Sequence, residues 1–219
     1  MKISDINQDL DTFVRKVLED DIAPGAVIRQ AELSEKLGVS TTPLRELLVL
    51  LRELDLIEVK PRAGFKVLYP DIEFMRENMQ LRVILENHAI ETFNEVVSNT
   101  WLEDQVLKHE KALHDLENVG DKQLQTLNES IFELDREFHR TIVAALKNKA
   151  VSKAHEYTQI KLQISRQVHR RIPPRKTNIV AMQDHLAILE ALATHDLTMV
   201  RAKLDSHFTQ SARNTLVGY

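Results

Sequence analysis

Four polar residues lie among apolar positions of predicted helices, and their types are those that hold metal ions. Asp135 and His139 are four residues apart, which places them on one face of a helix. His185 and His207 each lie on the apolar face of a further predicted helix. Because a buried polar group without a partner is costly, one shared partner explains the four better than four separate partners. Three imidazoles and a carboxylate suit a divalent transition metal (Zn²⁺, Ni²⁺, Mn²⁺ or Fe²⁺), with positions left for water or ligand oxygens. The alternative is four core polar residues, each satisfied by protein groups.

The remaining histidines are expected at the surface. They lie on polar helix faces or at helix ends, where histidine is usually exposed. These six residues are His88, His109, His114, His155, His169 and His195.

A second polar group lies nearer the middle of the chain. Arg82 and Glu86 are one helical turn apart, close to an apolar row that faces inward. A buried arginine can hold a carboxylate through two contacts. We favour a structural salt bridge between the two. The alternative is that they bind an effector acid beside the metal, and Arg166 is a weaker candidate for the same role.

The N-terminal segment predicts a DNA-binding module. A helix over about 4–21 precedes two short helices, near 30–37 and 42–54, which flank a Gly-containing turn. Two short strand patterns follow, around a hairpin tip at 61–64, and together these elements have the plan of a winged helix-turn-helix. The second helix of such a pair enters the major groove of DNA, and hydroxyl groups and free N–H groups at its start bind phosphate. The expected DNA contacts are Ser40, Thr41, Thr42 and Arg45 in the helix, and Arg62, Gly64 and Lys66 in the wing.

Beyond this module the sequence predicts helices alone. Apolar residues recur at helical spacing, and no strand pattern follows. The fold class is therefore mainly α: a winged helix-turn-helix over 1–69, then an all-α bundle of six to seven helices over 70–219. The six long helices are expected near 71–98, 101–117, 122–147, 149–169, 175–194 and 196–216.

The composition limits the classes of function. With 43% hydrophobic and 28% charged residues, the 219-residue chain has the balance of a soluble globular protein. The absence of cysteine excludes disulfides, thiol nucleophiles and cysteine-based zinc fingers. No apolar segment resembles a signal peptide or a membrane span, so we expect a cytoplasmic protein with no membrane partner.

The net charge of −4 at first argues against nucleic acid as a partner. Charge is not evenly distributed, however, because residues 41–69 hold five basic and four acidic side chains. We therefore expect weak, salt-sensitive binding to DNA that depends on a dimer.

The N-terminal residues resemble the GntR family of bacterial transcription regulators. The resemblance rests on the run Leu33-Ser34-Glu35-Lys36-Leu37-Gly38-Val39-Ser40-Thr41-Thr42-Pro43-Leu44-Arg45-Glu46 and on Gly64-Phe65-Lys66-Val67. The family commonly has arginine where this chain has Thr41. That difference affects the expected operator sequence but not the docking mode.

The helical part is similar to the FCD ligand-binding domain of the FadR subfamily. The pattern Asp135-x-x-x-His139, then Asp184-His185-Leu186 and His207-Phe208, resembles the metal-binding version of that domain, with all four ligand positions filled. The resemblance disfavours an acyl-CoA effector.

The leading hypothesis is a homodimeric regulator, most simply a repressor, that binds a palindromic double-stranded operator. A small carboxylate at the metal site would change its affinity for DNA. The alternatives are a metal-sensing regulator with no organic effector, a metal-dependent hydrolase, and a protein-interaction module without DNA. The hydrolase lacks a recognisable general base near the site.

Overall fold

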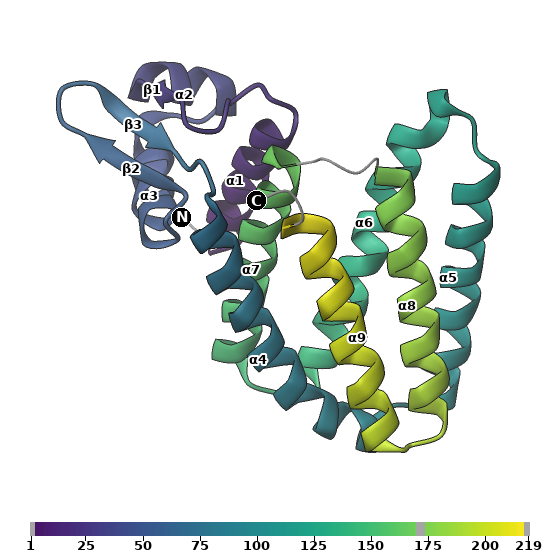
Figure 1. The fold of residues 1–219 in the computed structure, drawn as a ribbon. Coiled ribbons are helices and arrows are strands. Elements are labelled where there is room, and N and C mark those ends of the chain that lie inside the picture. Colours follow the sequence, from purple (N-terminus) through teal and green to yellow (C-terminus); the bar gives the residue numbers. More distant parts are fainter. Residues whose placement is uncertain (1–2, 170–173, 217–219) are drawn as a thin grey trace. The chain divides into compact units, whose positions relative to one another are not determined.

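The computed structural model describes residues 3–169 and 174–216. The chain divides into two compact units, Met1–Met75 with Ile160–Val168 and Arg76–Gln159 with His169–Tyr219. A small helical and stranded module thus precedes a set of long helices, which confirms the predicted fold class (Figure 1).

The first unit is built on three helices, α1 (Ile3–Leu18), α2 (Gln30–Leu37) and α3 (Thr41–Glu53). Their apolar residues recur at three- and four-residue spacing, so each helix buries one stripe in a shared core. Fully buried members of this core are Phe13, Val17, Leu33, Leu44, Leu47 and Leu51. The last part of α7 belongs to the same unit, where Gln167 donates a hydrogen bond to the Leu18 carbonyl (3.0 Å).

A three-stranded antiparallel sheet in the order β1-β3-β2 completes this unit. Strands β2 (Ile57–Lys60) and β3 (Gly64–Val67) form the predicted hairpin, with Val59 opposite Phe65. Strand β1 (Val27–Ile28) was not predicted. Two residues are too few to show an alternating pattern, so only its pairing with β3 reveals it.

Helix α3 begins one residue earlier than expected. Ser40 occupies the N-cap position, with extended backbone (φ −76°, ψ 172°) and no side-chain capping bond. Pro43 remains in the first turn, where its missing N–H costs nothing. The hydroxyl groups at this helix start are thus not used for capping.

Six long helices make up the rest of the described chain, all close to the predicted bounds. They are α4 (Ile72–Val96), α5 (Asn99–Asn118), α6 (Asp121–Ala144), α7 (Lys149–Val168), α8 (Pro174–Ala193) and α9 (Leu197–Leu216). Asp71 caps the start of α4, because its carboxylate accepts a hydrogen bond from the Phe74 N–H (2.8 Å). In the second unit, α8 packs between α5 and α9 (Figure 1).

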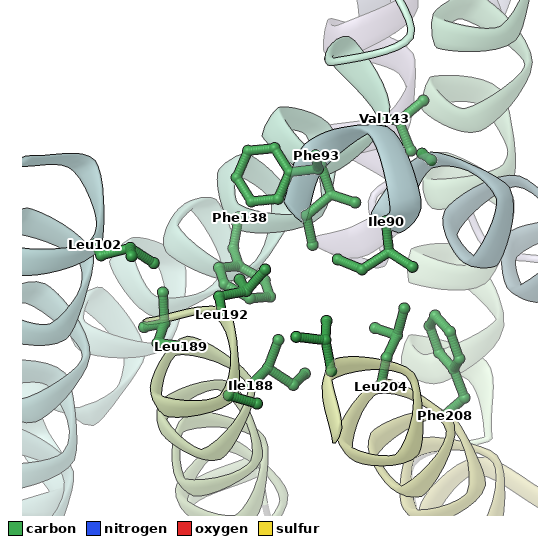
Figure 2. Close-up of a cluster of buried hydrophobic side chains, with 14 residues drawn as sticks. Ile90, Phe93, Leu102, Phe138, Val143, Ile188, Leu189, Leu192, Leu204 and Phe208 are labelled. Carbon is green, nitrogen blue, oxygen red and sulfur yellow. The ribbon is translucent and has the colours of Figure 1, made fainter. Parts of the chain in front are cut away.

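The core of the second unit collects side chains from five helices. Figure 2 shows Ile90 and Phe93 of α4, Phe138 of α6, and leucines of α5, α8 and α9 directed toward one another. The aromatic rings make specific contacts within this cluster: Trp101 stacks on Phe138 with ring centroids 6.2 Å apart. The polar residues of the candidate site lie on the same helices.

Gly64 provides a test of the sheet geometry. Its φ is +127°, and a Cβ there would lie 2.3 Å from the Ile28 carbonyl oxygen. We expect Gly64→Ala to lower the free energy of unfolding by about 2–3 kcal/mol. Gly38→Ala is the matched control, because Gly38 also has positive φ (+67°) but a Cβ there meets nothing within 4 Å. It should cost only about 1 kcal/mol. Equal losses in urea unfolding of the two variants would contradict the close approach of β1 and β3.

Candidate metal centre and DNA-binding helix

Three helices bring the predicted metal ligands together. Asp135 and His139 lie on α6, His185 on α8 and His207 on α9. His139 and His185 are fully buried, His207 is 3% exposed and Asp135 is 9% exposed. The helices that carry these imidazoles also supply the apolar core, so packing of the core brings the three histidines together.

The ligand atoms of the three histidines all lie within 4.8 Å of one another. The Nε2 atoms of His139 and His185 are 3.2 Å apart. The Asp135 Oδ1 atom is 3.5 Å from the His185 Nε2 and 3.8 Å from the His139 Nε2. Two imidazole nitrogens and a carboxylate oxygen therefore face one point, and the His207 ring lies beside them, with its centroid 4.8 Å from that of His185.

Carboxylates support the far side of two of these rings. The His139 Nδ1 is 2.6 Å from the Glu86 Oε2, and the His207 Nδ1 is 3.4 Å from the Asp184 Oδ2. Glu86 also accepts hydrogen bonds from the Arg82 Nε (2.8 Å) and the His155 Nε2 (2.9 Å). Second partners of this kind fix the orientation of metal-binding histidines.

The third ring, His185, has a neutral partner. Its Nδ1 lies 3.1 Å from the Nε2 of His109, whose Nδ1 in turn lies 2.7 Å from the Gln105 carbonyl oxygen. Each of the three histidines thus uses Nδ1 for a protein partner and directs Nε2 elsewhere.

Burial keeps His139 and His185 uncharged. It lowers the pKa of His139 to about 4, an effect that Arg82 reinforces, and it lowers the pKa of His185 well below the usual value, with His207 adding to the shift. Burial would raise the pKa of Glu86, but His139 and Arg82 hold it well below its usual value. The Glu86 carboxylate is therefore ionised and accepts a hydrogen bond from the Nδ1–H of a neutral His139, which leaves a lone pair on the His139 Nε2.

The donor set fits a divalent transition metal. The Nε2 atoms of His139 and His185 lie 3.2 Å apart. If both rings carry their proton on Nδ1, the two lone pairs would repel one another unless a cation lies between them. Two nitrogens bound to one metal at about 2.0–2.1 Å would be roughly 3 Å apart, close to this separation. The His207 Nε2 is buried and has no hydrogen-bond partner in the described part of the chain, as expected for an atom that a metal would use.

Arg82 lies beside this centre and is fully buried. Its Nε bonds Glu86, so the salt bridge favoured from the sequence is present. Its guanidinium carbon lies 5.5 Å from the centre of the Phe208 ring. Both Nη atoms are buried without a hydrogen-bond partner among the residues described, so the side chain also retains donors for a ligand.

Two histidines were wrongly expected at the surface. His109 is fully buried and His155 is 2% exposed, and both belong to the hydrogen-bonding network around the site. Their spacing contained the signal: His109 is seven residues after Leu102 and three before Ala112, both buried on α5. Charged neighbours in the sequence obscured it. Of the other four, His88, His114 and His195 are exposed and His169 is half-buried.

The other predicted effector residues lie in different surroundings. Glu86 already accepts hydrogen bonds from three protein groups, so it supports the Nδ1 side of the His139 ring. Arg166 is half-buried in the part of α7 that belongs to the first unit, so its role as an effector-binding residue stays a prediction.

The predicted DNA-contacting side chains are exposed. Ser40, Thr41, Thr42 and Arg45 follow one another at the start of α3, and no acidic residue lies in its first turn. Arg62 lies at the hairpin tip with φ +65°, and Lys66 is exposed on β3. Gly64 has no side chain to contact DNA. The close approach of β1 by itself requires glycine at this position.

Comparison with known proteins identifies both parts of the chain. Residues 10–67 match the gntR family of bacterial regulatory proteins, and residues 77–210 match the FCD domain. No helix within the described residues has the length and apolar character needed to cross a membrane.

Curated relatives and a solved structure agree with this match. The probable HTH-type transcriptional regulator LgoR of Escherichia coli (strain K12) is 25% identical over 93% of this chain, which spans 63% of the length of that relative. The HTH-type transcriptional repressor RspR of the same organism is 24% identical, over 94% of this chain and 86% of its own. The structure described as E. coli McbR/YncC has the same fold (TM-score 0.74, 22% identity, 94% of each chain).

These relatives are transcription regulators, which confirms the expectation of a regulator and not an enzyme. The sequence resemblance to GntR regulators of the FCD type is likewise confirmed. The chain belongs to the gntR family of bacterial regulatory proteins and carries an FCD domain behind its winged helix-turn-helix domain.

Proposed function

We propose that the chain is a cytoplasmic, homodimeric repressor whose affinity for a palindromic operator is set by a small carboxylate bound at a divalent-metal site. The observation that carries the proposal is the cluster of His139, His185, His207 and Asp135 beside Arg82. Buried lone pairs and buried unpaired N–H donors lie in the same helical core. A metal ion would satisfy the lone pairs. A carboxylate could then bind that metal through oxygen and also accept hydrogen bonds from the N–H donors.

The metal would be held by the three Nε2 atoms and the Asp135 carboxylate. Imidazole and carboxylate together suit Zn²⁺, Ni²⁺, Mn²⁺ or Fe²⁺. Such a metal, when bound, would supply further coordination positions for oxygens of a metabolite.

Arg82 favours an acid over a neutral sugar. A guanidinium group binds a carboxylate through two parallel hydrogen bonds, and the two Nη atoms of Arg82 are the ones left over after Nε bonds Glu86. Short hydroxy acids, sugar acids and dicarboxylates have oxygens for both the metal and the guanidinium.

The DNA-binding part of the proposal rests on the start of α3. Exposed hydroxyl groups and Arg45 lie together there, at the end of the helix with positive partial charge. A two-fold dimer would place two such helices on the two halves of a palindromic site. The name of the related repressor RspR supports the direction of regulation.

Substitution of the proposed ligands tests the metal site. We expect His139→Ala together with His207→Ala to abolish stoichiometric metal, because two of four ligands are removed. His88→Ala together with His114→Ala removes two exposed histidines and should leave the metal content unchanged. Elemental analysis of the purified chains gives the answer. One metal per chain in the first variant would contradict the ligand assignment.

Arg45→Ala tests the docking of α3. The probe is a duplex that the wild-type protein selects from a random-sequence library. We expect affinity to fall by about tenfold or more, and a shallower dependence on salt, because one contact to DNA is lost. Arg52→Ala, which removes an exposed arginine at the opposite end of α3, is the control. Unchanged affinity of Arg45→Ala in a gel shift would rule out this docking mode.

Arg82→Lys tests the effector class. Lysine keeps a positive charge near Glu86 but lacks the paired Nη donors. In a thermal-shift screen of Zn²⁺-loaded protein, we expect a small carboxylate to raise the melting temperature and to change affinity for DNA. The Arg82→Lys variant should bind that compound at least tenfold more weakly.

Retention of the full shift in this variant would contradict the role of Arg82. If no acid acts but Zn²⁺ alone changes affinity for DNA, the metal-sensing alternative replaces the carboxylate proposal.

A further inference from the structure

We propose that His109 is a positioning residue for the metal centre, which holds His185 in the tautomer that presents an unprotonated Nε2. This inference rests on the proposed metal site. His109 lies on α5, which supplies none of the four proposed ligands. It therefore acts on the site only through His185.

The hydrogen bonds determine where each proton lies. A carbonyl oxygen only accepts, so the His109 Nδ1, 2.7 Å from the Gln105 oxygen, carries its proton. A neutral ring has one N–H, which leaves a lone pair on the His109 Nε2. That lone pair accepts from the His185 Nδ1 at 3.1 Å, and the His185 Nε2 is then unprotonated. Both rings are fully buried, which disfavours a charged form of either.

Packing keeps the two rings in this relation. Phe138 stacks on His185, with centroids 4.3 Å apart and planes 18° apart. The same phenyl ring meets His109 edge-on at 5.5 Å and 71°. The hydrogen bond from His109 to the Gln105 carbonyl spans one turn of α5, so the helix backbone fixes the orientation of the His109 ring.

His139 and His207 are held in the same tautomer, with the proton on Nδ1, by a different kind of partner. His139 is backed by Glu86 and His207 by Asp184, and a carboxylate attracts the proton to Nδ1 by its charge. Besides the partly exposed Asp184, the buried residues Asp135 and Glu86 already bring two negative charges into the site, against one positive charge on Arg82. A further buried carboxylate behind His185 would add a desolvation cost, which a neutral histidine bonded to a backbone carbonyl avoids.

Removal of His109 should let His185 change tautomer. Without an acceptor at Nδ1, the proton is better placed on Nε2, which lies 3.5 Å from the Asp135 Oδ1 and 3.2 Å from the His139 Nε2. That form satisfies the metal-free site and blocks the atom that would bind the metal. Metal binding would then have to move the proton back to the His185 Nδ1, and the affinity for the metal would fall.

Histidine-selective ¹⁵N NMR of the metal-free, full-length protein reads the tautomer directly. We expect wild-type His185 to carry its proton on Nδ1, and His109→Leu to shift that proton to Nε2. His109→Gln should restore the wild-type pattern, because its side-chain oxygen can accept from the His185 Nδ1. His114→Leu, an exposed position on the same helix, is the control. A proton on Nε2 in the wild type, or an unchanged tautomer in His109→Leu, would overturn the inference even if one variant folds poorly.

A Co²⁺ titration of the same proteins, followed by visible absorption and by fluorescence of the single tryptophan, Trp101, measures the consequence. We expect His109→Leu to bind Co²⁺ about 10–100-fold more weakly, and His109→Gln to recover most of that loss. Equal affinity of His109→Leu and wild type would overturn the positioning role alone. A wild-type protein with the expected tautomer that binds no Co²⁺ would instead overturn the proposed metal centre, and the role of His109 with it.

Discussion

The ionised carboxylate of Glu86, fully buried in a helical core, is the interaction on which the candidate site depends. It is surrounded by donors from three side chains, the Arg82 Nε, the His139 Nδ1 and the His155 Nε2. An unpaired carboxylate there would cost several kcal/mol, so these partners must stay in place for the core to pack. The orientation of His139, and with it the direction of its Nε2, follows from that requirement.

The apolar core and the polar site form one structure. Phe138 lies between Trp101 and His185 and makes ring contacts with both, while Phe208 lies under the guanidinium of Arg82. Aromatic faces next to cations and imidazoles allow the helices to pack closely around polar groups that are already satisfied within the cluster. Buried side-chain atoms without a hydrogen-bond partner among the described residues include the His207 Nε2 and the Arg82 Nη atoms, which are therefore available to a bound group.

Much of this could be predicted from the sequence, because helical spacing is a local property. The periodicity placed the long helices and put Asp135, His139, His185 and His207 on inward faces. What it missed depends on contacts between elements. Strand β1 exists only through its pairing with β3, and the bond between His109 and His185 joins residues 76 positions apart. Spacing alone also could not show that Arg82 would bond Glu86 through Nε and keep both Nη atoms unpaired.

The arrangement of the site along the chain indicates how occupancy could reach DNA. Arg82 and Glu86 lie on α4, which begins five residues after the wing strand β3 ends. The proposed ligands lie on α6, α8 and α9, so a bound metal and acid would tie three further helices to α4. A ligand shifts a conformational equilibrium only by its difference in affinity for the two states, and couplings of about 1–3 kcal/mol suffice for regulation. Because residues 41–69 carry nearly balanced charge, the affinity for DNA is expected to be modest, and a coupling of that size then changes operator occupancy substantially.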